Sequence, residues 1–215
     1  MKILNSIALF AAIIILGVGC APTIYVSPDF EKVKNKHKIV AILPFNVQIS
    51  AKNLPKNVTP EMIREDEQKT GYAIQGHSYT YFLKESGKRH YTVKFQDIDK
   101  TNSLLTKMNI AYADLKSKGK DELCKMLEVD AVISGDVQME KPMSEGSAIA
   151  VGLLFGYWGS TNKVNVTMTI HEKTQGDLLW KYDWVAEGGV GSSSEQLGKN
   201  LVKNVSKKFP YQKDK

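Results

Sequence analysis

The fold of this chain is determined by residues 163–184, which read "KVNVTMTIHEKTQGDLLWKYDW". Apolar and polar side chains alternate from Val164 to His171 and again from Leu178 to Trp184. Alternation over this length is typical of strands with one buried face. The short polar segment between the two runs contains glycine, and such loops commonly join antiparallel strands. The stretch therefore predicts a β-hairpin.

Three further strands are predicted upstream of the hairpin. Residues 39–43 form an unbroken apolar run that ends at Pro44, and residues 129–137 form a second apolar run. Short runs of this kind suit strands that are buried on both faces. Residues 91–96, "YTVKFQ", alternate and predict another strand. The polar residues 46–58 predict a loop.

Predicted helices alternate with these strands. One extends from Thr59, a favourable cap, and Pro60, which suits the first helical position, to Gly87. The last helix repeats apolar residues every four positions from Leu197 to Phe209. Alternating strands and helices imply parallel strands with right-handed crossovers. We therefore expect an α/β fold: a single mixed β-sheet with parallel core strands, an antiparallel C-terminal hairpin and helices packed on it.

Residues 1–19 have the layout of a secretory signal peptide. Lys2 is their only charged residue, and the apolar run from Ile7 to Leu16 is too short to span a bilayer. A small residue directly precedes Cys20. This ending resembles the lipobox of bacterial lipoproteins, which implies cleavage before Cys20 and its modification by acyl chains such as palmitate. An ordinary secreted protein and an uncleaved anchor helix stay open as alternatives.

The residues that follow are predicted to form a tether and one domain. Residues 20–36 are polar and contain two prolines, which favours an extended tether, and residues 37–211 suit a single domain. Ala21 follows the lipidated position, and resemblance to lipoprotein sorting implies the outer membrane with the domain facing the periplasm. Cys124 is the one cysteine left in the mature chain, and its apolar neighbours predict that it is buried.

The charge of the chain argues against a nucleic-acid partner. The formal net charge is +6, but Arg64 and Arg89 are the only arginines. Proteins that recognise nucleic-acid sequences favour arginine because it forms bidentate contacts with bases. The lysine excess suits a solvated surface, and attraction to anionic lipid or polymer is the alternative.

Residues 146–162, "GSAIAVGLLFGYWGSTN", form an uncharged, glycine-rich apolar insert. Tryptophan and tyrosine are enriched at interfaces, and exposed apolar patches usually bind something. The insert is therefore a possible contact surface for a partner, a second copy or the membrane. Its predicted contact residues are Leu153, Leu154, Phe155, Tyr157 and Trp158. A buried loop or strand pair of the same domain is the alternative.

No catalytic residue, metal ligand or cofactor site is predicted. None of the four histidines has a second histidine at metal-ligand spacing, and His171 lies in a predicted strand and not in a helical zinc motif. The glycines of residues 188–191 precede a helix but lack the lysine of a phosphate-binding loop. Cys124 lies on an apolar helix face, where a thiol is a poor nucleophile.

Three stretches carry a family resemblance: "KIVAILPF" at residues 38–45, "ELCKMLEVDAVISGDV" at 122–137 and "VTMTIHEKTQGDLLWKYD" at 166–183. Together they resemble the CsgG-like superfamily, which includes the curli-secretion lipoprotein CsgG, LpoB and the N-terminal domain of TolB. The resemblance covers roughly residues 37–209. It implies a non-enzymatic assembly, adaptor or secretion component that holds a partner with its sheet, its sheet edges and inserted loops. The insert at 146–162 departs from the family pattern.

These observations predict an outer-membrane-anchored periplasmic lipoprotein that is not an enzyme. It acts as a non-catalytic adaptor or assembly factor of the cell envelope, bound to the membrane by its lipid and to an envelope protein or a second copy. A subunit of a CsgG-like secretion pore is the alternative, although residues 148–155 lack the alternation of a lipid-facing strand. An envelope enzyme is the third hypothesis, and a hydrolase activity lost on changing His171 or Cys124 would favour it.

Overall fold

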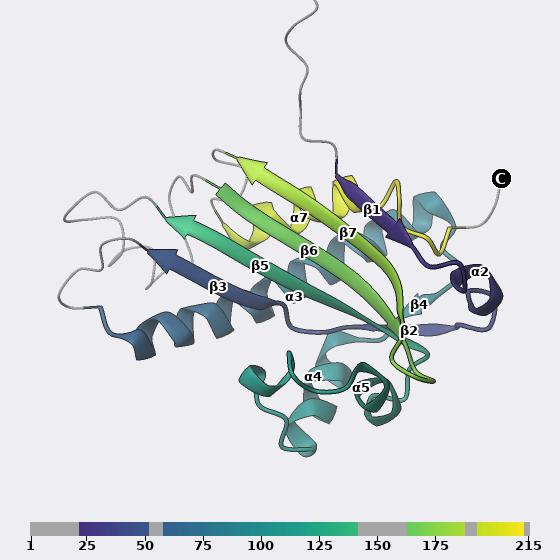
Figure 1. The fold of residues 1–215 in the computed structure, drawn as a ribbon, viewed down its shortest axis with the longest axis horizontal. Coiled ribbons are helices and arrows are strands. Elements are labelled where there is room, and N and C mark those ends of the chain that lie inside the picture. Colours follow the sequence, from purple (N-terminus) through teal and green to yellow (C-terminus); the bar gives the residue numbers. More distant parts are fainter. Residues whose placement is uncertain (1–21, 52–57, 142–162, 188–192, 213–215) are drawn as a thin grey trace, which may run out of the picture.

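The computed structural model describes residues 22–51, 58–141, 163–187 and 193–212 (Figure 1). The strands are β1 (Thr23–Val26), β2 (Ile39–Ile42), β3 (Asn46–Ala51), β4 (Lys94–Phe95), β5 (Ala131–Lys141), β6 (Lys163–Glu172) and β7 (Leu178–Glu187). The helices are α2 (Phe30–Val33), α3 (Pro60–Arg89), α4 (Ile98–Lys107), the 3-10 turn η2 (Tyr112–Asp114), α5 (Lys120–Met126) and α7 (Ser194–Val205). The strands form one mixed sheet, so the predicted α/β fold class is confirmed.

The strand order in the sheet is β1-β7-β6-β5-β2-β4, and β3 also pairs with β5. The predicted hairpin is confirmed, because β6 and β7 are antiparallel, with Val166 opposite Trp184 and Ile170 opposite Trp180. Strand β5 is antiparallel to β6, whereas β2 and β3 run parallel to β5. The long β5 therefore pairs with β2 along its first part and with β3 along its second.

The chain bends between β2 and β3 at Pro44 and Phe45. Proline has no N–H for a strand partner, so pairing is interrupted there. The Phe45 ring lies against Gly135 of β5, where a β-carbon would collide with the ring. The hydroxyl of Tyr112 donates to the carbonyl oxygen of Phe45 (2.7 Å) and accepts from the N–H of Val47 (2.9 Å). The bend thus depends on a glycine in one strand and a tyrosine from η2.

One face of the sheet is covered by α3 and α7, which lie side by side behind it (Figure 1). Alternate side chains of β6 and β7, such as Val166, Ile170 and Trp180, are buried in the core on this side. Phe209, just after α7, lies within 5.0 Å of the rings of both Phe82 and Tyr91, measured between ring centroids. The apolar side of the C-terminal helix thus covers the sheet.

The opposite face is covered only in part, by α4 and α5 (Figure 1). A smaller cluster fills this part: Ala41, Leu43, Leu105, Leu115, Leu123, Cys124, Leu127, Val129 and Val132. Strand β2 contributes alternate residues to both clusters, so its predicted burial on both faces is confirmed. Farther along, β5 and β6 carry polar side chains such as Gln138 and Thr167, and no described helix covers them.

Two segments that were predicted to be irregular contain strands. The expected tether of residues 20–36 includes β1, which pairs with β7, and α2, whose Phe30 is almost fully buried. Strand pairing and one buried aromatic residue therefore attach this segment to the domain. The expected loop of residues 46–58 begins with β3, whose Val47 is buried.

Helix α3 begins as predicted but differs in its end and in its buried face. Thr59 caps it through a hydrogen bond from the N–H of Met62 (3.3 Å), whereas His90, with φ 51°, ends it beyond Gly87. The three- and four-residue spacing of Tyr72, Gly76, Tyr79 and Leu83, with Phe82, predicts a buried stripe on this helix. Phe82 is fully buried as predicted, whereas Leu83 is 47% exposed. Much of the buried face is polar: Asp66, Thr70, Gln75 and Ser78.

Two of the predicted contacts lie outside the described residues. These are the predicted lipidation site Cys20 and the predicted contact residues of the insert, Leu153, Leu154, Phe155, Tyr157 and Trp158. Within the described ranges, no helix combines the length and the hydropathy needed to cross a bilayer.

Candidate functional site

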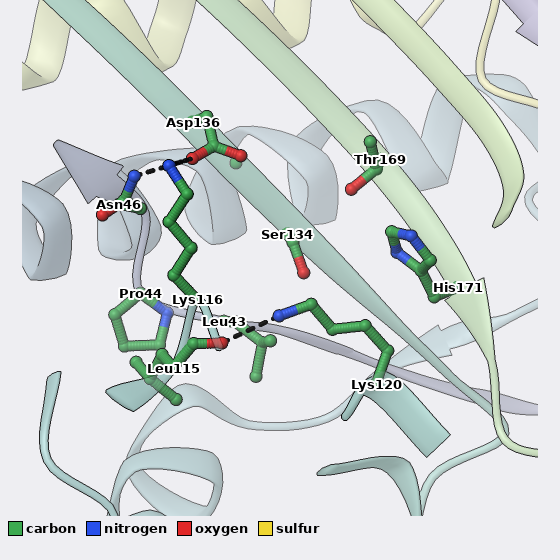
Figure 2. A pocket seen from close by; sticks show the side chains of 11 residues that line it. Leu43, Pro44, Asn46, Leu115, Lys116, Lys120, Ser134, Asp136, Thr169 and His171 are labelled. Atoms are coloured by element: carbon green, nitrogen blue, oxygen red, sulfur yellow. Dashed lines mark hydrogen bonds and ion pairs between the residues drawn. The ribbon is translucent and has the colours of Figure 1, made fainter. Parts of the chain in front are cut away.

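A pocket of about 230 Å³ opens on the partly covered face of the sheet (Figure 2). It lies where the apolar cover from α5 ends and the uncovered strands begin. Its polar lining comes from four places in the chain: β3, β5, β6 and the segment that leads from η2 into α5. The polar and charged residues that line it include Lys116, Lys120, Ser134, Asp136, Thr169 and His171.

The strand register places the pocket residues together. Ser134 of β5 is opposite Thr169 of β6, and Val132 is opposite His171. Because side chains alternate between the two faces of a strand, all four point to the face opposite α3 and α7. Val132 is part of the smaller apolar cluster, whereas Ser134 and Thr169, the next pair on this face, border the pocket. In Figure 2 the side chains of Ser134, His171 and Lys120 point toward the same space.

Two buried polar atoms in this pocket have no hydrogen-bond partner within the described structure. They are the hydroxyl oxygen of Ser134 and Nδ1 of His171. Burial, reinforced by the nearby charge of Lys120, lowers the pKa of His171 to about 4, so the imidazole is neutral at pH 7. Leaving such groups unpaired costs free energy. Their presence at a cavity wall indicates a place for a ligand or for ordered water.

The two lysines that line the pocket differ in their partners, because among the described residues Lys116 forms an ion pair and Lys120 does not. Lys116 pairs with Asp136 at 3.3 Å, and the side-chain amide of Asn46 donates to the same carboxylate (2.7 Å). Lys120 donates to the carbonyl oxygen of Leu115 (2.8 Å) and forms no ion pair with any described residue. Burial lowers the pKa of Lys120. The pocket thus contains one cation, half-buried, whose charge no contacting carboxylate neutralises.

The arrangement is suited to binding and lacks a paired nucleophile and base as it stands. Activating a serine requires a hydrogen bond to a base, and the Ser134 hydroxyl has none. Cys124 lies beneath the pocket and is fully buried, as predicted, with Sγ 3.8 Å from the carbonyl oxygen of His171. Burial raises the pKa of this thiol to about 12, which keeps it protonated at neutral pH.

The sequence did not predict this site. His171 was considered only as an isolated histidine in a strand, and Ser134 and Lys120 were missed. A signal for Ser134 exists, because Ser134 and Asp136 are two polar residues at alternate positions of an otherwise apolar run. No sequence signal marks Lys120. Among the described residues, no group of three His, Cys, Asp or Glu side chains is placed to hold a metal ion.

A second candidate surface is the edge strand β1. It pairs with β7 on one side, and no described strand pairs with its other side. Ile24, Tyr25 and Val26 are 36%, 46% and 49% exposed. Exposed apolar edges readily accept a strand from another chain.

The edge of β3 is protected instead. Its outward N–H groups donate to side chains, from Val47 to the Tyr112 hydroxyl and from Ile49 to the carboxylate of Glu67 (2.8 Å). Side chains here occupy the positions that a neighbouring strand would need. The edges of the sheet at β1 and at β3 therefore differ in their availability to a partner.

Comparison with known proteins gives only weak likenesses. No protein-family model matches the chain, and no curated protein matches it. Among solved structures, the PelC dodecamer from Paraburkholderia phytofirmans is 12% identical with a TM-score of 0.41, over 91% of this chain and 99% of that chain. The LpoB C-terminal domain from Salmonella enterica is 8% identical with a TM-score of 0.36, over 70% and 83%.

A third solved structure, lipoprotein GNA1162 from Neisseria meningitidis, is 14% identical with a TM-score of 0.38, over 80% of this chain and 96% of that chain. LpoB is one of the proteins that the sequence resemblance names. Likenesses at these scores carry no argument about function, so membership of the CsgG-like superfamily stays a prediction.

Proposed function

We propose that this chain is a lipoprotein of the bacterial cell envelope, anchored by Cys20 in the outer membrane and facing the periplasm. It acts as a non-catalytic adaptor that holds an envelope protein beside the membrane. The observation that carries the proposal is the position of β1, an exposed apolar edge strand that begins three residues after Cys20.

The short connection limits how far the domain can lie from its anchor. Three residues span at most about 11 Å when fully extended. A domain bound through a lipid on Cys20 therefore keeps β1 close to the bilayer surface. A partner that adds a strand to β1 is held at the same level, with backbone hydrogen bonds supplying affinity and Ile24, Tyr25 and Val26 supplying apolar contacts.

The anchor is tested by mass spectrometry of the protein isolated from the envelope. We expect a mature chain that begins at an acylated Cys20, and we expect Cys20→Ser to release the protein from the membrane fraction. An unmodified thiol or an intact Met1 on the isolated protein contradicts the anchor.

The adaptor role is tested separately by photo-crosslinking in the native envelope. A benzophenone amino acid replaces Tyr25, and the matched control carries it at Leu83, which is equally exposed (47%) but lies on α3. We expect one defined protein to be crosslinked from position 25 and not from position 83. A product with twice the mass of the chain would replace the adaptor role with self-association, and identical products from both positions would remove β1 as a binding edge.

A further inference from the structure

The pocket on the partly covered face goes beyond the proposed function, because it is remote from β1 in the strand order and does not depend on the lipid. Three features converge there: a half-buried ammonium without an ion pair, two buried polar atoms without hydrogen bonds, and a cavity of about 230 Å³. A buried cation and unpaired buried polar groups are both unfavourable alone. One ligand that accepts hydrogen bonds and carries negative charge would satisfy all three.

We propose that this pocket binds a carboxylate group, with Lys120 supplying the positive charge and Ser134 and His171 the hydrogen bonds. The Lys120 ammonium has three N–H donors and uses one of them for the Leu115 carbonyl oxygen. The Ser134 hydroxyl is a free donor at the cavity wall. The neutral imidazole of His171 can donate from one ring nitrogen.

The charged residues of the pocket favour a ligand with a single negative charge. Lys116 is already paired with Asp136, which leaves Lys120 as the lining cation without an ion pair among the described residues. The Asp136 carboxylate also borders the pocket and repels a dianion more strongly than a monoanion. A phosphorylated side chain carries about 1.5 to 2 negative charges at neutral pH. A carboxylate, which carries one, fits this balance better.

The size of the cavity indicates what kind of molecule carries the carboxylate. One water molecule occupies about 30 Å³ in the liquid, so the cavity holds a group of several heavy atoms. An acidic side chain or the C-terminal carboxylate of a peptide has this size. Leu43, Pro44 and Leu115 supply an apolar wall for the carbon atoms of such a group.

The test uses the full-length protein in detergent micelles, labelled with ¹⁵N and ¹³C at its histidines, of which there are four. The probe is sodium acetate, titrated at constant ionic strength and pH 7. Acetamide is the neutral probe of the same shape, and inorganic phosphate, a mixture of monoanion and dianion at this pH, is the more highly charged one. The signal of His171 is assigned by its loss in His171→Gln.

We expect acetate to shift the His171 signal saturably and to leave the His77 signal unchanged. Acetamide should not shift the His171 signal saturably. Lys120→Met should weaken acetate binding about tenfold or more, because it removes a charge-assisted hydrogen bond. Lys107→Met, at an exposed lysine on α4, is the matched control and should leave binding unchanged. Ser134→Ala should weaken binding several-fold, and it keeps the test decisive if Lys120→Met does not fold.

Three results would overturn the inference. Equal shifts from acetate and acetamide, or no saturable shift, would show that the pocket holds only water. Equal affinities in Lys120→Met and Lys107→Met would show that Lys120 does not bind the anion. Tighter binding of phosphate than of acetate would assign the pocket to a phosphorylated ligand.

Discussion

The two faces of the sheet are packed in different ways. Toward α3 and α7, alternate side chains of β5, β6 and β7 enter a continuous core rich in aromatic rings. Toward α4 and α5, the cover ends after Val132, and Ser134 and Thr169 border a pocket. Apolar burial is the dominant favourable term in folding. The first face therefore supplies most of the stability, while the second retains polar groups whose hydrogen bonds are incomplete.

The largest effect should come from the aromatic centre of the first face. Phe209→Ala removes a ring that lies near Phe82, Tyr91 and Trp180. We expect the free energy of unfolding to fall by about 3–5 kcal/mol, measured by chemical denaturation. A loss below about 1 kcal/mol would mean that this face is not the main source of stability.

The contact between the two strands at the bend should be nearly as sensitive. Gly135→Ala places a β-carbon against the Phe45 ring, and we expect a loss of about 3 kcal/mol. Gly76→Ala is the matched control, because its β-carbon would meet only Ile98, at 3.8 Å, and alanine favours a helix interior by about 0.5–1 kcal/mol. Equal effects of the two substitutions on the denaturation midpoint would contradict this account of the bend.

On the second face, stability should depend on pH through His171. Its pKa is lowered from 6.5 to about 4 by burial and by Lys120. Between these values the unfolded chain binds a proton that the folded chain does not, so the free energy of unfolding falls as the pH decreases from about 6.5 to about 4. We expect His171 to account for roughly 2–3 kcal/mol of this loss.

Denaturation curves of the parent protein and of His171→Gln, recorded from pH 7.5 to 4, isolate this contribution. Burial also lowers the pKa of His37, but His37 is present in both proteins and its effect cancels in the difference. Parallel pH profiles for the two proteins would mean that His171 titrates normally.

The smallest effect should come from a hydrogen bond on the uncovered part of the second face. The Thr167 hydroxyl donates to the carboxylate of Asp183 (2.6 Å). Thr167→Val should cost about 1 kcal/mol. Thr169→Val is the control, because the Thr169 hydroxyl has no hydrogen bond within the described residues. The thermal midpoint of this variant should stay near that of the parent protein.

The sequence predicts the elements whose burial follows a simple period. Strands β6 and β7 alternate cleanly, and β2 is apolar throughout, so local pattern and tertiary packing agree. Helix α3 is different, because its buried face is set by its partner. Gln75 lies over the sheet and donates to the carbonyl oxygen of Ile42 (2.7 Å). A polar residue that is buried because of such a specific hydrogen bond does not follow the apolar period of a helix, so the sequence pattern does not reveal it.

The pocket was not predictable for a related reason. Lys120 lines the same pocket as Ser134 and His171 because the segment between η2 and α5 packs on this face of the sheet through Leu115 (Figure 2). Strand β1 escaped prediction because its four residues are exposed and its place in the sheet depends on backbone pairing with β7. Neither contact has a counterpart in the local sequence pattern.

The side chains of Tyr112 and Glu67 accept hydrogen bonds from outward N–H groups of β3. These hydrogen bonds also limit how copies of the chain can assemble. Copies can join into a chain through strand pairing only if each copy has two open sheet edges, one for the preceding copy and one for the next. In the described part of this chain the border at β3 is blocked, while the one at β1 is open. Head-to-tail growth from β1 of one copy onto β3 of the next is therefore blocked, which favours recruitment of a single molecule at β1 over growth of a fibre through these two borders.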